Sequence, residues 1–211
     1  MSVGNSILNT LRYFDIFGFP LTAREVHNNL YEPDADYSFL QIQNALDAID
    51  KNLLQEKEGF YFLNGKAENI ARRKARYLIV KNKLRRANFL IKLISRMPSV
   101  RAVFICNDVA YENAPDDSDI DLAIITKANR IWTARFFTTL LTKMTNNRPT
   151  PRNRKNKICL SFYVSEANLN LERVAYPNDI HFYYWLSQFQ PMYGEADTFD
   201  RFYTANEWLK K

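Results

Sequence analysis

The 211-residue chain is poor in residues that build several common kinds of site. Its two cysteines, Cys106 and Cys159, lie far apart, which excludes a disulfide scaffold or a cysteine-based zinc site and favours a reducing cytoplasm. None of the five glycines lies between residues 66 and 193, so the middle of the chain holds no glycine-rich phosphate loop. No apolar run of ~18 residues is present to cross a membrane, and the first five residues lack the basic start of a secretory signal. We therefore expect a cytoplasmic protein with no membrane partner.

Charge is distributed in blocks along a chain of ordinary globular composition, which is 46% hydrophobic with a net charge of +6. Residues 66–101 carry a net charge of +11, residues 102–125 a net charge of −6, and residues 126–157 a net charge of +9. An acidic cluster between two basic blocks has two interpretations. It is either a metal site beside a polyanion-binding surface, or one acidic loop between two solvated helix faces.

The first 65 residues have the order of elements of a winged helix-turn-helix. Apolar residues at helical spacing predict a first helix that Gly18 ends, and Thr22 with Glu25 predicts a capping box on a second. A third helix is expected over residues 39–52, and two short apolar runs around a glycine-containing turn predict a hairpin over residues 53–63.

Direct DNA binding is the less favoured interpretation of this segment. Residues 1–65 carry a net charge of −5, and the expected recognition helix offers Asp47 and Asp50 against Lys51 alone. Because duplex binding gains most of its affinity from phosphate neutralisation, contact with a protein or with the rest of the chain is preferred.

A long basic helix is predicted from Ala67 to Met97, a stretch without glycine or proline. Its apolar residues form a seam made of Ile70, Tyr77, Leu84, Ile91 and Ile94, widened by Leu78, Leu90 and Leu93. The basic residues between them include Arg72, Arg73, Lys74, Lys83, Arg85 and Arg86. They form either a solvated face or a groove for nucleic acid or nucleotide phosphates.

The chemistry of the chain is expected in its middle. A strand over residues 100–106 leads into a polar loop, and Asp119-Ile120-Asp121 then opens a second strand. Alternate residues of a strand point to the same side, so Asp119 and Asp121 project together. Two such carboxylates suit Mg²⁺ (or Mn²⁺) holding the phosphates of a nucleoside triphosphate. Plain loop structure is the alternative.

The string Ser118-Asp119-Ile120-Asp121-Leu122 after a strand resembles the signature of the polymerase β-like nucleotidyltransferases. The whole chain is similar to bacterial proteins that place a winged-helix segment before such a domain. The resemblance implies Asp119 and Asp121 as catalytic metal ligands, with Asn107, Asp108 and Ser118 lining the phosphate loop.

Two positions depart from the family pattern. The family's Gly-Ser pair falls on Asn107-Asp108. The carboxylate of Asp108 would repel an anionic triphosphate at this place. The family's third carboxylate, commonly the general base, usually lies on a later strand; the best match here is a strand over residues 157–164, which places that position at Ser161. Glu166 or Asp108 is left to substitute for it.

The remaining segments are interpreted as support. Asn129 is expected to cap a helix that ends near Met144 and faces the sheet with Ile131, Ala134, Phe137, Leu140 and Leu141. The basic loop at residues 146–156 closes over nucleotide, binds an acidic partner or is merely solvated. The aromatic residues of segment 179–190 are expected to be core or interface, and both cysteines to be small hydrophobes.

We therefore predict an α/β (α+β) protein in three parts: a winged-helix-like module (1–65), a basic connecting helix (66–98) and a nucleotidyltransferase-like mixed sheet with flanking helices (99–211). The leading hypothesis is Mg²⁺-dependent transfer of a nucleotidyl group from a nucleoside triphosphate to a hydroxyl on RNA, protein or a small molecule. One alternative is a catalytically degenerate module that binds nucleotide, nucleic acid or protein. The other is a winged-helix regulator.

Overall fold

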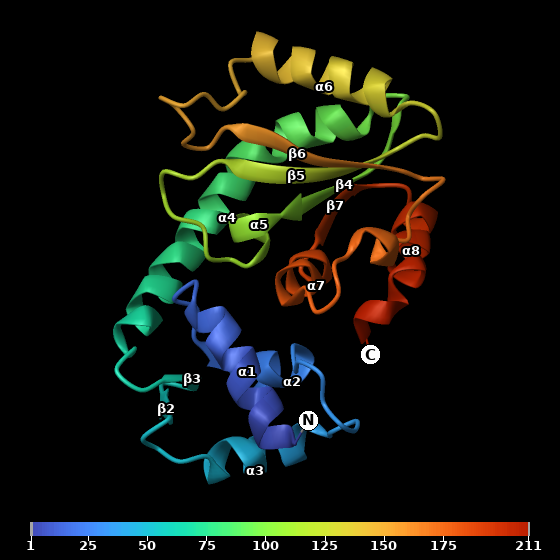
Figure 1. Cartoon of the computed structure of the whole chain (residues 1–211). Coiled ribbons are helices and arrows are strands. Elements are labelled where there is room, and N and C mark those ends of the chain that lie inside the picture. Colours follow the sequence, from blue (N-terminus) through green and yellow to red (C-terminus); the bar gives the residue numbers. More distant parts are fainter. Residues whose placement is uncertain (1, 211) are drawn as a thin grey trace. The chain divides into compact units, whose positions relative to one another are not determined.

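Figure 1 shows a computed structural model of the chain, which describes residues 2–210. The fold is mixed α/β, and within these residues lie eight α-helices, two 3-10 helices and two β-sheets. The chain divides into two compact units, Met1–Arg76 and Tyr77–Lys211, with the boundary inside helix α4 (Glu68–Ser95). Over residues 2–210, no helix has the length and apolarity needed to cross a bilayer.

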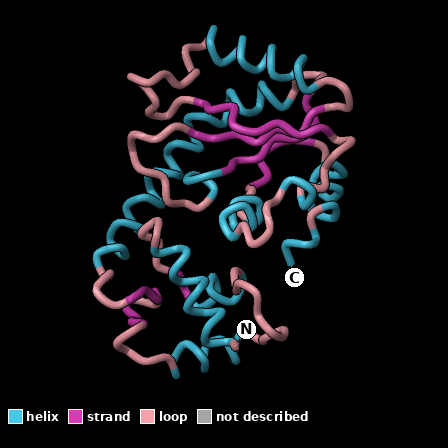
Figure 2. The backbone as a smooth tube through the Cα atoms, viewed as in Figure 1, coloured by secondary structure: helices cyan, strands magenta, loops and turns pink. Residues whose placement is uncertain are grey.

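The second unit is built on a four-stranded sheet with the order β6-β5-β4-β7, the larger group of magenta strands in Figure 2. β4 (Val100–Cys106) is antiparallel to β5 (Ile120–Thr126) and to β7 (Gln190–Gly194), whereas β6 (Ile158–Ser165) is parallel to β5. β4, β5 and β6 confirm the predicted strands. Strand β7 was not predicted from the sequence. It requires a close approach to β4 that only glycine allows, because a Cβ on Gly194 would lie 2.7 Å from Ala102.

Helices cover both faces of this sheet (Figure 1). One face packs against α6 (Ile131–Met144) and α4 in a core that contains Ile91, Ile94 and Leu122. The other face packs against α7 (Ile180–Ser187) and α8 (Ala196–Ala205). The shorter elements of this unit are α5 (Asn107–Ala110), η1 (Glu172–Val174) and η2 (Glu207–Lys210). Tyr184 and Phe189 are buried, as the core interpretation of the aromatic segment predicts.

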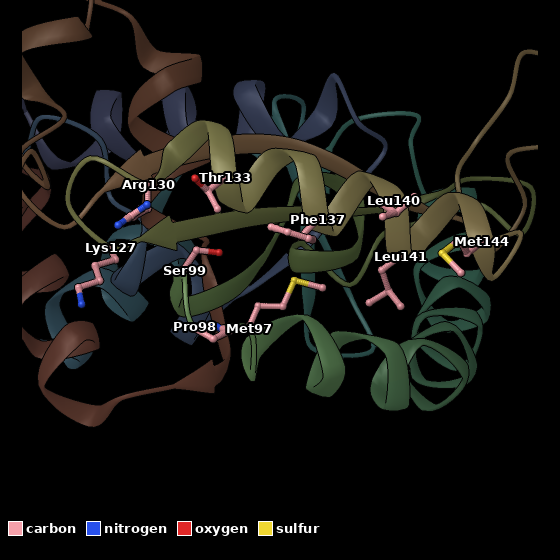
Figure 3. Close-up of a pocket in the computed structure, with 10 residues that line it drawn as sticks. All are labelled: Met97, Pro98, Ser99, Lys127, Arg130, Thr133, Phe137, Leu140, Leu141 and Met144. Atoms are coloured by element: carbon pink, nitrogen blue, oxygen red, sulfur yellow. The ribbon is translucent and has the colours of Figure 1, made fainter.

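Helix α6 differs from its prediction in two ways. Its N-cap is Arg130 rather than Asn129, which has a φ of +60°. Its buried stripe is Ala134, Thr138 and Thr142. Threonine fits there because both hydroxyls donate to backbone carbonyls one turn earlier in the helix, at 2.7 and 3.0 Å. The expectation that Phe137 and Leu140 face the sheet is therefore wrong: they are 50% and 42% exposed and line a groove, shown in Figure 3.

The first unit pairs a small antiparallel sheet with short helices. Its elements are α1 (Val3–Asp15), β1 (Leu21–Thr22), α2 (Ala23–Asn28), α3 (Phe39–Ala48), β2 (Leu54–Lys57) and β3 (Phe60–Leu63). The strand order is β1-β3-β2, and β2 and β3 form the predicted hairpin. The predicted capping box of Thr22 and Glu25 is confirmed. Helix α3 ends at Ala48, earlier than the expected residue 52.

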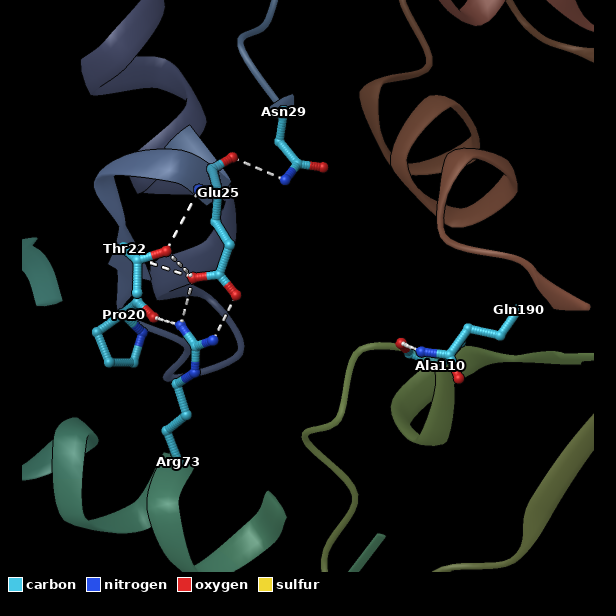
Figure 4. Close-up of polar contacts among 7 residues, drawn as sticks. All are labelled: Pro20, Thr22, Glu25, Asn29, Arg73, Ala110 and Gln190. Atoms are coloured by element: carbon cyan, nitrogen blue, oxygen red, sulfur yellow. Dashed lines mark hydrogen bonds and ion pairs between the residues drawn. The ribbon is translucent and has the colours of Figure 1, made fainter. Parts of the chain in front are cut away.

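Arg73 of α4 is a structural residue of this unit and not a solvated or phosphate-binding cation. Its guanidinium lies 4.1 Å from the centroid of the Phe19 ring and forms an ion pair with Glu25 (Figure 4). Burial opposes ionisation of Glu25, but the hydrogen bonds and charge of Arg73 outweigh it and hold the pKa of Glu25 below its ordinary value. Arg73 also donates to the carbonyl of Pro20, so it ties α4 to the segment before α2.

Candidate metal and phosphate site

The sheet of the second unit brings the predicted aspartates together with a cysteine. Asp121, near the start of β5, pairs with Cys106 of β4 on one side and with Cys159 of β6 on the other. Asp119 lies just before β5. One ligand atom each from Asp119, Asp121 and Cys159 lies within 4.8 Å of the other two. Two carboxylates and a sulfur atom therefore converge at one end of the sheet.

Asp119 is nearly inaccessible and forms an ion pair. Its side chain is 6% exposed, and Nη2 of Arg154 donates to both of its carboxylate oxygens, at 3.0 and 3.2 Å. The Arg154 side chain is 64% exposed and comes from the predicted basic loop. This loop thus contributes a counter-ion to the aspartate pair, a role that the sequence analysis did not assign.

Asp121 is held by the strand beside it. The hydroxyl of Ser161 donates to Oδ1 of Asp121 and also contacts Sγ of Cys159 at 3.2 Å. The position expected for a third carboxylate is therefore occupied by a hydroxyl that serves Asp121.

Cys159 is not the small core hydrophobe that was expected. It is half-buried beside the carboxylates. Its burial raises the pKa of the thiol, and the negative charge of Asp121 raises it further. Cys106 is fully buried in the core, as expected.

A buried lysine holds the loop that precedes Asp119. Lys83 of α4 is 1% exposed, and its ammonium donates to the carbonyls of Asp116 (3.0 Å) and Ser118 (2.6 Å) and to Oδ1 of Asn156 (3.3 Å). Burial lowers its pKa from the ordinary value. The three bonds tie α4 to the segments before β5 and β6. The interpretation of Lys83 as a solvated or phosphate-binding cation is therefore wrong.

The three residues predicted to line a phosphate loop lie around this site but make other contacts. The hydroxyl of Ser118 donates to the carbonyl of Pro115 at 3.0 Å. Asn107 has a φ of +57°, a left-handed conformation that asparagine adopts more readily than most residues. Its Oδ1 accepts from Nε1 of Trp185 at 2.6 Å. Asp108 is exposed and is not among the three converging ligand groups.

Glu166 lies too far from the aspartate pair to act as the general base that the resemblance implies. It follows the far end of β6, where Ser165 pairs with Thr126, about 17 Å along the strands from Asp121. The backbone N–H of Ala128 donates to Glu166 Oε1 and Arg101 donates to Oε2, both at 3.0 Å. These two donors hold the pKa of Glu166 below its ordinary value. Glu166 is a structural carboxylate.

In comparisons with protein-family models, curated proteins and solved structures, nothing matches this chain.

Proposed function

We propose that the second unit is a nucleotidyltransferase-like domain. It would bind a divalent cation with a nucleoside triphosphate and transfer the nucleotidyl group to an acceptor hydroxyl. The observation that carries the proposal is the convergence of Asp119 and Asp121 at the end of a mixed sheet, with ligand atoms within 4.8 Å. Two carboxylates with room for phosphate oxygens and waters are the donor set that Mg²⁺ prefers.

The charges around the pair support a cation site. Two carboxylates this close repel each other, and among residues 2–210 the cation paired with Asp119 is Arg154, whose side chain is 64% exposed. Because Asp119 is only 6% exposed it needs a positive partner, and a divalent cation can take over this role from the exposed Arg154 side chain. When bound, the cation would neutralise the triphosphate charge that develops during transfer. Asp119 and Asp121 would hold it, and the freed Arg154 would be available to the phosphates.

Non-catalytic binding is a second candidate, and one observation favours it. Ser161 stands where the resemblance implies a general base, and Glu166 is bound by Arg101 and Ala128. A domain with the metal ligands and without a base would bind nucleotide without turnover.

The first unit fits a contact module better than a DNA reader. Its helices and hairpin have the order of a winged helix, but residues 1–65 carry a net charge of −5. We propose that this unit binds a protein surface. The acceptor brought to the second unit would be an RNA or a protein. A winged-helix regulator stays the third alternative. The cytoplasmic location is part of the same proposal, and both cysteines are free, as a reducing compartment requires.

Thermal unfolding with nucleotide and metal tests the proposal. At ~100 times the dissociation constant, Mg²⁺ with a nucleoside triphosphate adds about 2.7 kcal/mol. That raises the midpoint by roughly 5–10 °C for a protein of this size. The double variant D119N/D121N should lose the shift, and D117N, an exposed aspartate of the same loop, should keep it.

Pyrophosphate release then separates the two candidates. A metal-dependent shift with pyrophosphate release on addition of RNA, protein or small-molecule acceptors supports transfer. A shift without release across these acceptors supports binding alone. No shift with any of the four nucleotides in Mg²⁺ or Mn²⁺ overturns both.

A further inference from the structure

A groove of about 660 Å³ runs along α6, beside the helix face that carries its buried threonines. Its second wall is Met97, Pro98 and Ser99, which connect α4 to β4. From α6, Phe137, Leu141 and Met144 line it at helical spacing, so an apolar stripe follows its length (Figure 3). This volume lies within the usual range of small-molecule sites, about 300–1,000 Å³.

The charge of the groove is confined to one end. Lys127 and Arg130, just before α6, both line it, and Figure 3 shows them together at the end opposite Met144. Across residues 2–210, neither side chain forms an ion pair, and both residues are exposed. None of the described residues that line the groove is acidic. Arg130 and Met144 are fourteen residues apart, which corresponds to about 21 Å along a helix.

We propose that this groove binds an amphiphilic anion, an acyl chain that ends in a carboxylate. The chain would lie along Phe137, Leu141 and Met144, and the carboxylate would contact Lys127 and Arg130. Two unpaired cations at the mouth of an apolar groove complement such a ligand in charge and in shape. The inference is independent of the nucleotidyltransferase proposal, because none of the residues involved belongs to the aspartate site.

Two other occupants fit the groove less well. The α6 of a second copy carries Arg135 and Lys143 and no acidic residue, so it cannot neutralise the two cations. A folded protein partner needs roughly 800 Å² of its surface covered in a stable complex. A groove lined by ten residues is small for that purpose.

Calorimetric titration of the full chain with laurate, below its micelle concentration, tests the inference. We expect saturable binding of one laurate per chain. Because each buried methylene tightens binding about fourfold, decanoate, which is two methylenes shorter, should bind roughly fifteenfold more weakly. Dodecanol, which has the chain without the charge, should bind at least tenfold more weakly than laurate.

Paired variants distinguish laurate binding in this groove from non-specific adsorption elsewhere on the protein. K127A/R130A should weaken laurate binding at least tenfold, whereas K143A/R152A, with the same loss of charge outside the groove, should change it less than twofold. F137Q should weaken binding, and F136Q, an exposed neighbouring phenylalanine that does not line the groove, should not. Circular dichroism confirms that each variant is folded.

Three results would overturn the inference. The first is no binding of laurate up to its micelle concentration. The second is equal weakening by F137Q and F136Q or by the two charge variants. The third is a concentration-dependent dimer, seen by light scattering, that F137Q dissociates while laurate does not compete.

Discussion

The two ends of the four-stranded sheet each pair an arginine with a carboxylate, but the two pairs are built differently. At one end, Glu166 receives one donor on each oxygen, from Arg101 and from the backbone of Ala128. At the other end, Asp119 is bound by Arg154, whose side chain is 64% exposed against 26% for Arg101. A second carboxylate, Asp121, lies beside Asp119.

This difference separates a structural carboxylate from a candidate ligand. Fixed donors saturate Glu166, so a metal or substrate would gain nothing that the protein does not already provide. Asp119 and Asp121 repel each other, and their partners are an exposed arginine and a hydroxyl. An incoming cation relieves that repulsion. We expect variants at the Glu166 end to change stability and variants at the aspartate end to change binding.

The largest effect on stability is expected from Lys83. This buried lysine holds the loop that leads to Asp119. K83M keeps most of the side-chain volume but removes the ammonium that donates to the carbonyl of Asp116, and it leaves the carbonyl of Ser118 with the backbone N–H of Asn156 as its donor. We expect a loss of about 2–4 kcal/mol in the free energy of unfolding. Chemical denaturation measures it, with K81M at an exposed position of the same helix as the control. Equal stability of the two variants would contradict the structural role of Lys83.

Removal of Glu166 is expected to cost less. E166A leaves Arg101 with only the more exposed Glu195 as its partner and removes the acceptor of Ala128. We expect a loss of about 1–3 kcal/mol, measured by denaturation against the exposed E172A. The nucleotide-dependent rise of the melting temperature should be unchanged. If E166A removes that rise, Glu166 belongs to the site and the comparison fails.

Lowering the pH should remove part of the stabilisation that Glu166 provides. Its pKa in the folded protein lies below the ordinary value of 4.5, chiefly because of the Ala128 N–H and then of Arg101. The stabilisation is therefore fully present above pH 4.5 and is lost as the pH falls through the folded-state pKa. The difference in unfolding free energy between wild type and E166A should be largest at pH 7 and smaller at pH 3.5. A difference that is constant with pH would show that packing, and not ionisation, is responsible.

The smallest effect on stability is expected from Asp121. D121N removes one of two like charges and keeps an oxygen that can accept from Ser161. We expect a change of less than about 1 kcal/mol, toward greater stability. The same variant should lose the metal- and nucleotide-dependent rise in melting temperature. Strong destabilisation with the rise intact would mean that Asp121 is structural and that the two ends of the sheet are alike.

Much of the second unit could be predicted from local patterns. The runs of β-forming residues gave strands β4 and β5, the resemblance gave β6, and side-chain alternation along the strand placed Asp119 and Asp121 on the same side. The seam of α4 was predicted only in part: Ile91 and Ile94 are buried, but Tyr77 is 48% exposed and Leu78 is 61% exposed. The buried stripe instead passes through Val80, Lys83 and Ala87.

Lys83 shows what signal was available and why it was missed. It lies three residues after Val80 and four before Ala87, so a lysine interrupts an apolar stripe at helical spacing. In a helix with many basic residues, that interruption looks like one more solvated cation. Only the packing of α4 beside the loop before β5 identifies its acceptors.

The sequence by itself determined strands β4 and β5, the extent of helix α6, the capping box at Thr22 and the spacing of the aspartate pair. These features depend on residues close together in the chain, where side-chain period and backbone preference decide the conformation. The tertiary structure alone decided which partners the charged residues have: Arg154 on Asp119, Lys83 on the loop, Arg101 on Glu166. It also decided that Cys159 faces Asp121, because the register between two strands sets that contact. Charges act through space, and folding brings these pairs together from positions 33 to 65 residues apart.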